Sequence, residues 1–479
     1  MNSLKQAAYY AIGIILMKGL SLIMIPYITH TMTLAEYGSL ESLVLLADIG
    51  TILFSFGIVD AMYRYVGTAK GDAKRDLISN CFTLSVLVCV LGATLIAMSL
   101  PWLIMVLPVK FEAYQILLLL IPTMLDGAIS IPMTLLRMNA LARRFCLLNV
   151  LKAALQALMT FVLLEAGYGI DGVLISAAVS SVVLLLCLLG YQWQEMGRFG
   201  YLKSSKVILS FGFPVLVGGT SLYMINGLDR WFLASFVGVE ELAVYAVSAK
   251  FALMLGLILQ PYALWWFPNR VAMLQRDDGN KICADRAILG VNLGIIIGIF
   301  MILTVPGFIT LILPDSYQQA GTIVVALLVI GVIKNSGDYL NLGCYSGDSS
   351  YAQMWIQGIC AIIAASGYFI AVPLYGLWGV AAVLMTAYLL RLMLLYICSQ
   401  SMEFLPYEHS KWLICFAIAL STFSLNRFLS HVLTGVPELL LGIFISVVAL
   451  LCFIKCGVIS IPHEVFSKLG IGRRTHDEV

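Results

Sequence analysis

The sequence predicts an all-α, polytopic membrane protein of about 14 transmembrane helices: two six-helix lobes related by a parallel repeat, plus two extra C-terminal helices. Three observations predict this fold class. Of the 479 residues, 61% are hydrophobic and only 11% are charged, and the mean hydropathy of +0.97 lies far outside the range of soluble domains. Apolar runs long enough to cross a bilayer follow one another with short breaks. Sequence motifs also recur about 207 residues apart.

Each predicted span is an apolar stretch of about 20 residues or more, which as a helix covers roughly 30 Å of hydrocarbon. Both the membrane crossings and the short loops between them follow from this pattern. In order, the spans are 8–29, 38–66, 77–107, 115–139, 147–165, 172–193, 207–237, 242–267, 286–313, 319–344, 352–373, 377–400, 411–430 and 437–458.

Two motifs show the duplication. Tyr168-Gly-Ile-Asp-Gly-Val173 recurs 207 residues later as Tyr375-Gly-Leu-Trp-Gly-Val380, between two long apolar runs in each copy. Leu34-Ala-Glu-Tyr37 corresponds to Leu242-Ala-Val-Tyr245 at an offset of 208. Because six spans precede the seventh, both copies start on the same side of the membrane, which predicts a parallel repeat.

The repeat defines the expected domain organisation. Residues 1–196 are predicted to form the N-lobe with spans 1 to 6, and residues 207–402 the C-lobe with spans 7 to 12. Between them, the basic and amphipathic residues 197–206 are expected to form a linker on the membrane surface. Residues 403–479 hold spans 13 and 14 and a tail, and these two spans have no counterpart in the repeat.

The loop cations predict the orientation. One set of breaks between spans holds eighteen Lys and Arg residues, whereas the other holds only Lys110 and Arg427. The positive-inside rule therefore places both termini in the cytoplasm, in a multi-pass protein of the bacterial cytoplasmic (inner) membrane. The first span is longer than the apolar region of a secretory signal and is expected to be retained. A net charge of +2 gives no reason to expect a nucleic-acid partner.

Enzyme motifs find little support, so the protein is expected to be a transporter and not an enzyme. GxxxxGK[ST], HExxH and GxSxG are absent. Gly167-Tyr-Gly-Ile-Asp-Gly172 matches GxGxxG, but it lies in a turn between two membrane helices and not between a strand and a helix. The eleven cysteines are scattered without a CxxC pair. We expect no cofactor and no metal site.

The functional signal lies in ionisable residues inside the spans, each of which costs at least about 2.5 kcal/mol at the bilayer centre unless it faces a cavity or a partner. Eight are basic and five acidic, an excess that suits an anionic group such as a phosphate. They are Lys18, Asp48, Asp60, Arg64, Asp126, Arg137, Lys152, Asp229, Arg230, Lys250, Lys334, Asp338 and Arg391.

These residues carry different weight as substrate-binding candidates. Lys18 is the strongest, because it lies about ten residues, or roughly 15 Å, from either end of its span, beyond the reach of a snorkelling side chain. Arg391 is also near mid-span. Arg137 and Lys250 lie nearer span ends, where snorkelling is an equally good explanation.

Pairing within a helix is the competing explanation for other charges. Asp60 with Arg64, and Lys334 with Asp338, are i,i+4 pairs that can neutralise each other. Asp229 and Arg230 are adjacent, so their side chains point about 100° apart and each needs another helix or a ligand.

Carboxylates inside the spans are candidates for ion coupling. Asp48, Asp126 and Asp229 lie within predicted spans, where a buried carboxylate can bind a proton or Na⁺. Coupling of transport to a gradient of either ion is therefore a hypothesis for this chain.

Several motifs resemble one family of transporters. Asp229-Arg-Trp-Phe-Leu-Ala-Ser-Phe-Val-Gly238 with Val244-Tyr-Ala-Val-Ser-Ala-Lys250, Leu34-Ala-Glu-Tyr-Gly38, and Tyr375-Gly-Leu-Trp-Gly-Val-Ala-Ala382 resemble motifs of the Wzx-type polysaccharide (O-antigen) flippases. This family belongs to the multidrug/oligosaccharidyl-lipid/polysaccharide exporter superfamily, which also includes MATE multidrug extruders and lipid II flippases. The resemblance covers nearly the whole chain and implies a MATE-like, V-shaped pair of six-helix lobes.

The resemblance also implies a function. It predicts a flippase that moves undecaprenyl-diphosphate-linked oligosaccharide repeat units from the cytoplasmic to the periplasmic leaflet by alternating access, for O-antigen (lipopolysaccharide), capsule or exopolysaccharide. Cationic cavity residues of relatives correspond here to Lys18, Arg230 and Lys250. The implied partners are membrane lipids, a polysaccharide polymerase and the chain-length machinery.

Two alternatives stay open at this point. A cation-coupled extruder of small molecules shares the fold but is expected to have a cavity with acidic and aromatic groups. A membrane glycan polymerase or ligase uses the same lipid-linked substrate but is expected to have a sizeable periplasmic loop, which this chain lacks.

Overall fold

The computed structural model describes residues 3–107, 109–345, 351–429 and 436–457, and within these residues every regular element is a helix. The predicted tail beyond residue 457 lies outside them. Among the described residues, thirteen helical stretches are long and apolar enough to cross a membrane. One stretch, Ala352–Met402, contains two predicted spans, so the structure confirms the all-α polytopic class and the estimate of about fourteen crossings.

The chain divides into two compact units that are described separately. Unit 1 comprises residues 1–247 and 361–383, and unit 2 comprises residues 248–360 and 384–479. The predicted lobe boundaries in the 197–206 linker stay predictions.

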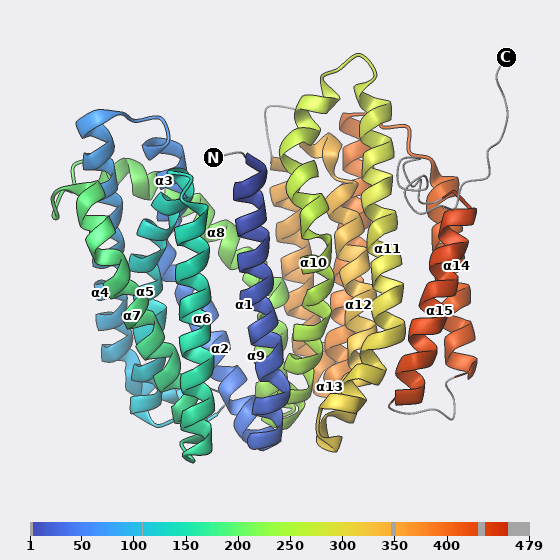
Figure 1. Cartoon of the computed structure of the whole chain (residues 1–479), viewed down its shortest axis with the longest axis horizontal. Coiled ribbons are helices and arrows are strands. Elements are labelled where there is room, and N and C mark those ends of the chain that lie inside the picture. Colours follow the sequence, from blue (N-terminus) through green and yellow to red (C-terminus); the bar gives the residue numbers. More distant parts are fainter. Residues whose placement is uncertain (1–2, 108, 346–350, 430–435, 458–479) are drawn as a thin grey trace. The chain divides into compact units, whose positions relative to one another are not determined.

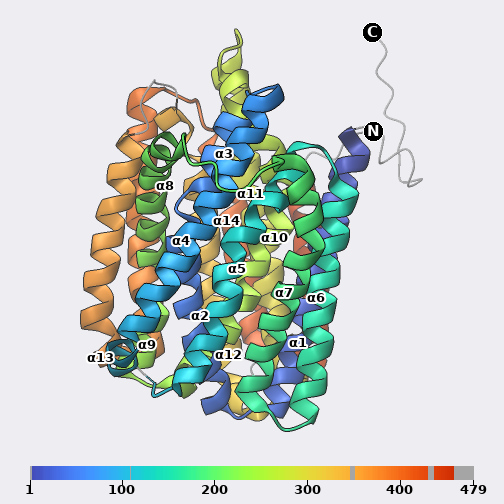
Figure 2. The same cartoon turned by 90° about the vertical axis from the view of Figure 1, so that its left-hand side faces the viewer.

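Unit 1 is a bundle of apolar helices. Within it, α1 packs on α6, α5 and α6 pack on α7, and α2 and α3 pack on α8. Figure 2 shows α4, α5, α6 and α7 running along one another. Its helices are α1 (Ser3–Thr31), α2 (Leu34–Ser55), α3 (Ile58–Val66), α4 (Gly71–Val106), α5 (Ala113–Met138), α6 (Ala142–Glu165), α7 (Gly169–Met196), α8 (Ser205–Asn226), α9 (Leu228–Phe236) and the beginning of α10 (Val239–Leu274).

Unit 2 is built around α11, which packs on α12, α14 and α15 (Figure 1). Its core includes Trp266, Val291, Tyr339 and Phe453, each at most 1% exposed. It contains the remainder of α10, α11 (Gly279–Ile312), the 3-10 turns η1 (Asp315–Tyr317) and η2 (Leu342–Tyr345), α12 (Gln318–Tyr339), both ends of α13 (Tyr351–Met402), α14 (His409–Leu429) and α15 (Val436–Lys455).

The repeated turn has the same backbone conformation in both copies. Gly169 has φ +50° and its equivalent Gly376 has φ +53°, in the left-handed region that favours glycine. The chain reverses at Gly376, inside α13. Gly367 and Val383, on either side of it, are in contact, since a methyl added to Gly367 would lie 2.9 Å from a methyl of Val383. Sixteen residues of straight helix would separate these two positions by about 24 Å. The motif is therefore the corner of a helical hairpin.

Two predicted spans are each divided into two helices. The predicted span 38–66 is interrupted at Phe56 and Gly57, both in the left-handed region with φ +42° and +65°, which separate α2 from α3. The predicted span 207–237 is interrupted at Gly227, which separates α8 from α9. The second break places α9, with its charged residues, as a short independent element.

Candidate functional site

Unit 1 contains a polar cluster where the beginning of α2, the short helix α9 and the beginning of α10 come together. We call it the α2–α9 cluster, and it consists of Tyr37 and Glu41 of α2, Asp229 and Arg230 of α9, and Tyr245 of α10. All except Arg230 are at most 2% exposed. So many buried polar groups in a hydrophobic unit must be held by hydrogen bonds and opposite charges.

The two tyrosines of this cluster occupy equivalent positions of the repeat, and each holds a carboxylate. The Tyr245 hydroxyl donates a hydrogen bond to Asp229 Oδ2. The Tyr37 hydroxyl is hydrogen-bonded to the carboxylate of Glu41. The tyrosine of the duplicated Leu-Ala-x-Tyr motif therefore has the same chemical role in both copies, with the acid supplied from a different place.

Acidic groups outnumber the arginine here. Asp229 and Glu41 of the cluster, and the exposed Asp48 of α2 outside it, all act electrostatically on Arg230, so three carboxylates act on one guanidinium. Among the described residues, Asp229 Oδ1 and Arg230 Nε have no hydrogen-bond partner. A buried carboxylate with an open oxygen is stabilised by a proton or a small cation, and this cluster is therefore suited to binding one.

Close backbone contact brings the helices of this cluster together. A methyl added to Gly38 of α2 would overlap the carbonyl oxygen of Val239, at the beginning of α10. Glycine at this position lets the two helices approach, as small residues do in membrane helix packing. The break at Gly227 then turns α9 so that Asp229 is buried against α10.

The other predicted unit 1 residues lie outside the α2–α9 cluster. Lys18 is exposed on α1 and has no hydrogen bond or ion pair with any residue that the structure describes. Asp126 of α5 is half-buried and interacts electrostatically with Lys152 of α6. Arg137 lies over the ring of Tyr63, with 5.6 Å to the ring centre, and Nη2 also donates to Thr134 Oγ1 at 3.0 Å.

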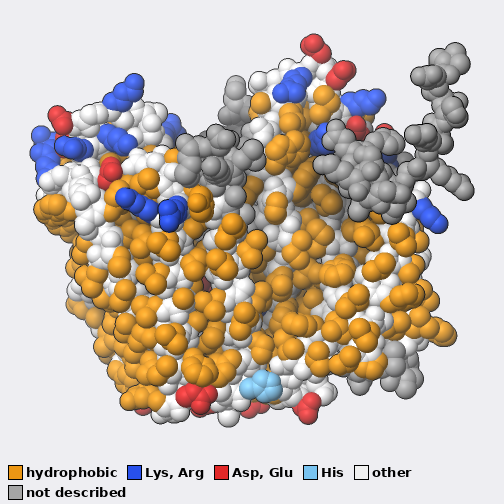
Figure 3. Space-filling view, viewed as in Figure 1, with side chains coloured by type: hydrophobic (Ala, Val, Ile, Leu, Met, Phe, Trp, Pro, Cys, Tyr) orange, Lys and Arg blue, Asp and Glu red, His pale blue; other side chains and the backbone are white. Residues whose placement is uncertain are grey.

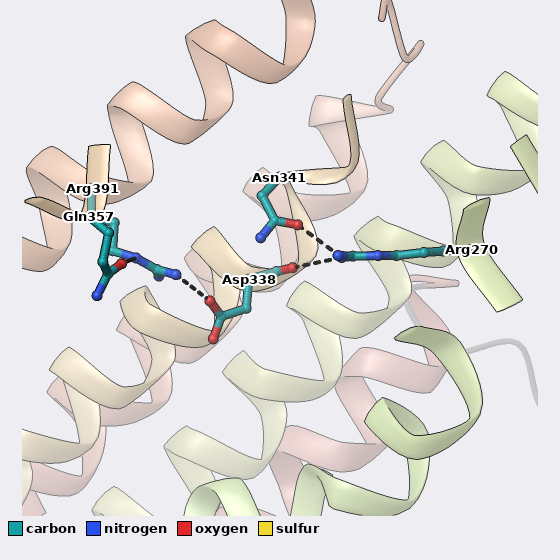
Figure 4. A network of polar contacts seen from close by, with 5 residues as sticks. All are labelled: Arg270, Asp338, Asn341, Gln357 and Arg391. Atoms are coloured by element: carbon teal, nitrogen blue, oxygen red, sulfur yellow. Dashed lines mark hydrogen bonds and ion pairs between the residues drawn. The ribbon is translucent and has the colours of Figure 1, made fainter. Parts of the chain in front are cut away.

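Unit 2 contains a second network, shown in Figure 4. Arg391 of α13 is 8% exposed. Its Nη2 bonds Asp338 Oδ1 of α12 at 2.7 Å, and its Nε donates to Gln357 Oε1 at 3.0 Å. The Asp338 side chain is 35% exposed, against 10% for that of Arg391. The carboxylate is therefore the accessible end of this ion pair.

Arg270 joins the same network from the other side of α12. Its Nη1 donates to Asn341 Oδ1 at 2.9 Å and to the backbone carbonyl of Asp338 at 3.4 Å, as Figure 4 shows. The guanidinium lies between the rings of Phe267 and Tyr345, 4.9 and 4.4 Å from the ring centres. Burial lowers the pKa of Arg270, and Tyr345 and Asp338 act in the opposite direction. Two arginines thus converge on one aspartate, which leaves a net positive charge.

The i,i+4 interpretation of the charged pairs is wrong for unit 2. Asp338 bonds Arg391, while the Lys334 ammonium lies 5.9 Å from the centre of a tyrosine ring. In unit 1, Arg64 likewise lies over the ring of Phe211, at 5.0 Å. These cations are held by other helices and by aromatic faces, not by the acid one turn away.

Lys250 is separate from the unit 2 network. It is half-buried on α10, the helix that also carries Arg270. Twenty residues of helix separate the two positions by about 30 Å. Lys250 and Arg270 therefore cannot contact the same small group within unit 2.

Sequence reasoning missed two buried charges. Arg270 lies beyond the predicted span 242–267, whereas α10 continues to Leu274 and buries Arg270 to 7% exposure. Glu41 was omitted although it lies in the predicted span 38–66, close to its beginning, and it is 2% exposed. The available signal was helical spacing, since Glu41 follows Tyr37 by one turn.

A metal site finds no support in the part of the chain that the structure describes. Within it, no group of three or more His, Cys, Asp or Glu side chains could hold a metal ion.

Two units of apolar helices that bury charged networks define a polytopic membrane protein with a transporter fold. The chain belongs to the polysaccharide biosynthesis protein family, whose model matches residues 3–273. No curated protein matches the sequence.

Solved structures share the fold at low sequence identity. The lipid II flippase MurJ, in an inward closed conformation, superposes with a TM-score of 0.76 at 12% identity, covering 94% of this chain and 99% of that one. An inward-facing multidrug MATE transporter of the MOP superfamily has a TM-score of 0.59 at 14% identity, covering 79% of this chain and 97% of its own. A MATE transporter of Vibrio cholerae has a TM-score of 0.54 at 13% identity, covering 83% and 95%. The predicted family and fold are thereby confirmed.

Proposed function

We propose that the protein is a flippase, a transporter and not an enzyme, that moves undecaprenyl-diphosphate-linked oligosaccharide repeat units to the periplasmic leaflet by alternating access. Membership of the polysaccharide biosynthesis family carries this proposal. The MurJ-like fold over 94% of the chain supports it, because that relative is named as a flippase of a lipid-linked substrate. The product is O-antigen, capsule or exopolysaccharide.

Cationic side chains supply the chemistry for a diphosphate head group. Lys18 is exposed on α1 with no partner among the described residues, so its ammonium is available to a phosphate. In unit 2, Arg391 and Arg270 exceed the charge of Asp338. Arg137 and Lys250 are further candidates, and Arg230 contributes less because three carboxylates act on it.

A proton or Na⁺ gradient is proposed to drive the cycle. Asp48, Asp126 and Asp229 are the candidate coupling groups, and Glu41 joins them because it is buried beside Arg230. Protonation of one carboxylate would reduce the acidic excess around Arg230 and change the stability of the α2–α9 cluster. If transport in vesicles is unchanged after both gradients are collapsed, the coupling proposal is wrong.

Topology and location follow from the loop charges. Both termini are proposed to be cytoplasmic in a bacterial inner-membrane protein, because eighteen loop cations lie on one side and two on the other. Membrane lipids, a polymerase and the chain-length machinery are the proposed partners. Single cysteines introduced at Lys110 and Lys203 in a cysteine-free background test this topology. A membrane-impermeant thiol reagent added from outside should label the cysteine at position 110 and not the one at position 203.

Gene deletion tests the function. In a strain that lacks the protein, lipid-linked repeat units should accumulate in the cytoplasmic leaflet. If unpolymerised units reach the periplasm instead, the protein is a polymerase or ligase and not a flippase. Lys18→Ala should abolish export while leaving membrane insertion intact, because a point charge for the diphosphate is lost. Full export by this variant would remove Lys18 from the binding residues.

One observation favours a second candidate function, a cation-coupled extruder of small molecules. Two carboxylates of the α2–α9 cluster and Asp48 outside it act on one guanidinium, which suits a cationic substrate. Sensitivity of a deletion strain to cationic dyes, with normal surface polysaccharide, would support the extruder and exclude the flippase.

A further inference from the structure

We infer that unit 1 carries a binding site for an anionic phospholipid, separate from any site for transported cargo, in a groove between α4, α7 and the 197–204 segment. The groove has a volume of about 400 Å³ and is lined by Phe82 of α4, by Leu189, Gly190, Gln192, Trp193 and Met196 of α7, and by Phe199. We call it the α4–α7 groove. Its volume falls within the range of about 300–1,000 Å³ typical of small-molecule sites.

The wall formed by the 197–204 segment is anchored to α4. Ser79 Oγ donates to the backbone carbonyl of Arg198 at 2.6 Å, and the Gly200 amide donates to Thr83 Oγ1 at 3.1 Å. The rings of Phe82 and Phe199 meet edge to face with 6.2 Å between their centres. The groove therefore has a fixed apolar wall on each side. An acyl chain can fill the space between these walls.

One polar side chain beside the groove, Gln192, lacks adequate bonding. Gln192 is only 1% exposed, and its Oε1 has no hydrogen-bond partner among the described residues. Its Nε2 reaches only Met196 Sδ, at 3.7 Å. Such an amide is costly to bury. Its polar atoms are covered, so the surface of the groove is apolar and suits an acyl chain.

Cations lie in the segment that forms one wall of the groove and just after it. Arg198 precedes Phe199 and already pairs with Asp76, whereas Lys203 and Lys206 are exposed in and just after the same segment. Figure 3 shows Lys and Arg side chains gathered at one end of unit 1 beside a broad hydrophobic surface. Each cation near a membrane surface favours an anionic lipid roughly fivefold over a zwitterionic one. An apolar groove with a basic rim thus selects an anionic phospholipid.

A phospholipid fits better than a polyprenyl phosphate, which shares its charge and apolar character. The groove runs along α7 from Leu189 to the segment that begins after Met196. The seven helical steps from Leu189 to Met196 correspond to about 10 Å, which accommodates the first part of one acyl chain. A polyprenyl tail of many isoprene units would extend far beyond it.

Quenching of Trp193, which lines the groove and is 59% exposed, tests the inference. The full-length protein is placed in phosphatidylcholine nanodiscs that contain a minor fraction of brominated phosphatidylglycerol or brominated phosphatidylcholine. Subtracting the signal of Trp193→Phe isolates this tryptophan. We expect brominated phosphatidylglycerol to quench Trp193 fluorescence at a several-fold lower fraction of the total lipid than brominated phosphatidylcholine does. Equal quenching by both lipids would overturn the inference.

Two variants separate charge from shape. The double variant Lys203→Gln and Lys206→Gln should lower the preference for phosphatidylglycerol over phosphatidylcholine by roughly fivefold for each cation removed. Gly190→Leu should block quenching by both lipids, because Gly190 lines the groove and a Cβ added there meets no atom within 4 Å, which leaves the space of the groove for the leucine side chain. Gly256→Leu, at another open helical glycine, is the matched control and should quench like the wild type.

Competition decides between lipid sources. Unlabelled phosphatidylglycerol should relieve the quenching at a lower concentration than undecaprenyl phosphate does, and the reverse order would refute the phospholipid assignment. A preference for phosphatidylglycerol that survives in the double lysine variant would also refute the phospholipid assignment. Both lysines are exposed, so their replacement should leave the packing of the helices unchanged. Because the readout needs no transport, it is independent of the proposed flippase function.

Discussion

The ion pair between Asp338 and Arg391 should respond unequally to loss of its two partners. Asp338→Asn leaves a guanidinium whose side chain is 10% exposed, with Gln357 as its remaining bonding partner. Arg391→Gln leaves a carboxylate that is 35% exposed and can be hydrated. Removing one partner of a buried pair costs about 3–5 kcal/mol, whereas exposed pairs contribute about 0–1 kcal/mol.

These magnitudes predict an order of stability. Asp338→Asn should lower the free energy of unfolding by about 3 kcal/mol, and Arg391→Gln by about 1–2 kcal/mol, because the isolated carboxylate reaches water. The double variant should cost less than the sum of the two single changes, since no unpaired buried charge remains. Lys411→Gln removes a surface pair with Glu408, which is 2.8 Å long against 2.7 Å for Asp338 and Arg391 but is 48% exposed on each side, and should cost about 0–1 kcal/mol.

Equilibrium unfolding of the purified protein in mixed detergent micelles measures all four variants. The reasoning is refuted if Asp338→Asn costs no more than Arg391→Gln, or if the single effects simply add. Either result would mean that Arg391 is hydrated or paired elsewhere, and that the network in Figure 4 does not hold the guanidinium.

Two further predictions concern the α2–α9 cluster. Gly38→Ala should destabilise the protein by about 1–3 kcal/mol, because its methyl would overlap the carbonyl of Val239, while Gly19→Ala, with no atom within 4 Å, should be neutral; a shift in melting temperature by fluorescence-detected size exclusion measures both. Tyr245→Phe should cost about 1.5–3 kcal/mol by removing the hydrogen bond to Asp229, and unchanged unfolding would show that this bond is not formed.

Composition and repeats predicted most of the architecture. The apolar runs correspond to helices because only helices and closed barrels satisfy the backbone in lipid. The duplicated turn was also informative, since Gly169 and Gly376 share a positive φ that other residues adopt at a cost. Hydropathy could not predict the breaks at Gly57 and Gly227, because the apolar run resumes after each, past Asp60 in one case and past Asp229 and Arg230 in the other.

The charged residues were predicted as a list and not as an arrangement. The sequence identifies Asp229, Arg230 and Arg391 as unusual, but it does not say which helix supplies the partner of each. Arg391 bonds Asp338 from another helix, and the tyrosine of the repeat binds Asp229. Arg270 was missed because a hydropathy window ends before the helix does. Such pairings depend on tertiary packing, which a single sequence does not reveal.

Reconstitution with a defined lipid-linked oligosaccharide tests the central claim most directly. Proteoliposomes loaded with fluorescent undecaprenyl-diphosphate-linked oligosaccharide are exposed to a membrane-impermeant reagent that destroys the label only in the outer leaflet. If the protein is a flippase of this substrate, the label of both leaflets is lost, and Lys18→Ala leaves about half of it protected, as in vesicles without protein. Protection of half the label by the wild-type protein, with an ion gradient of either sign imposed, would contradict the assignment.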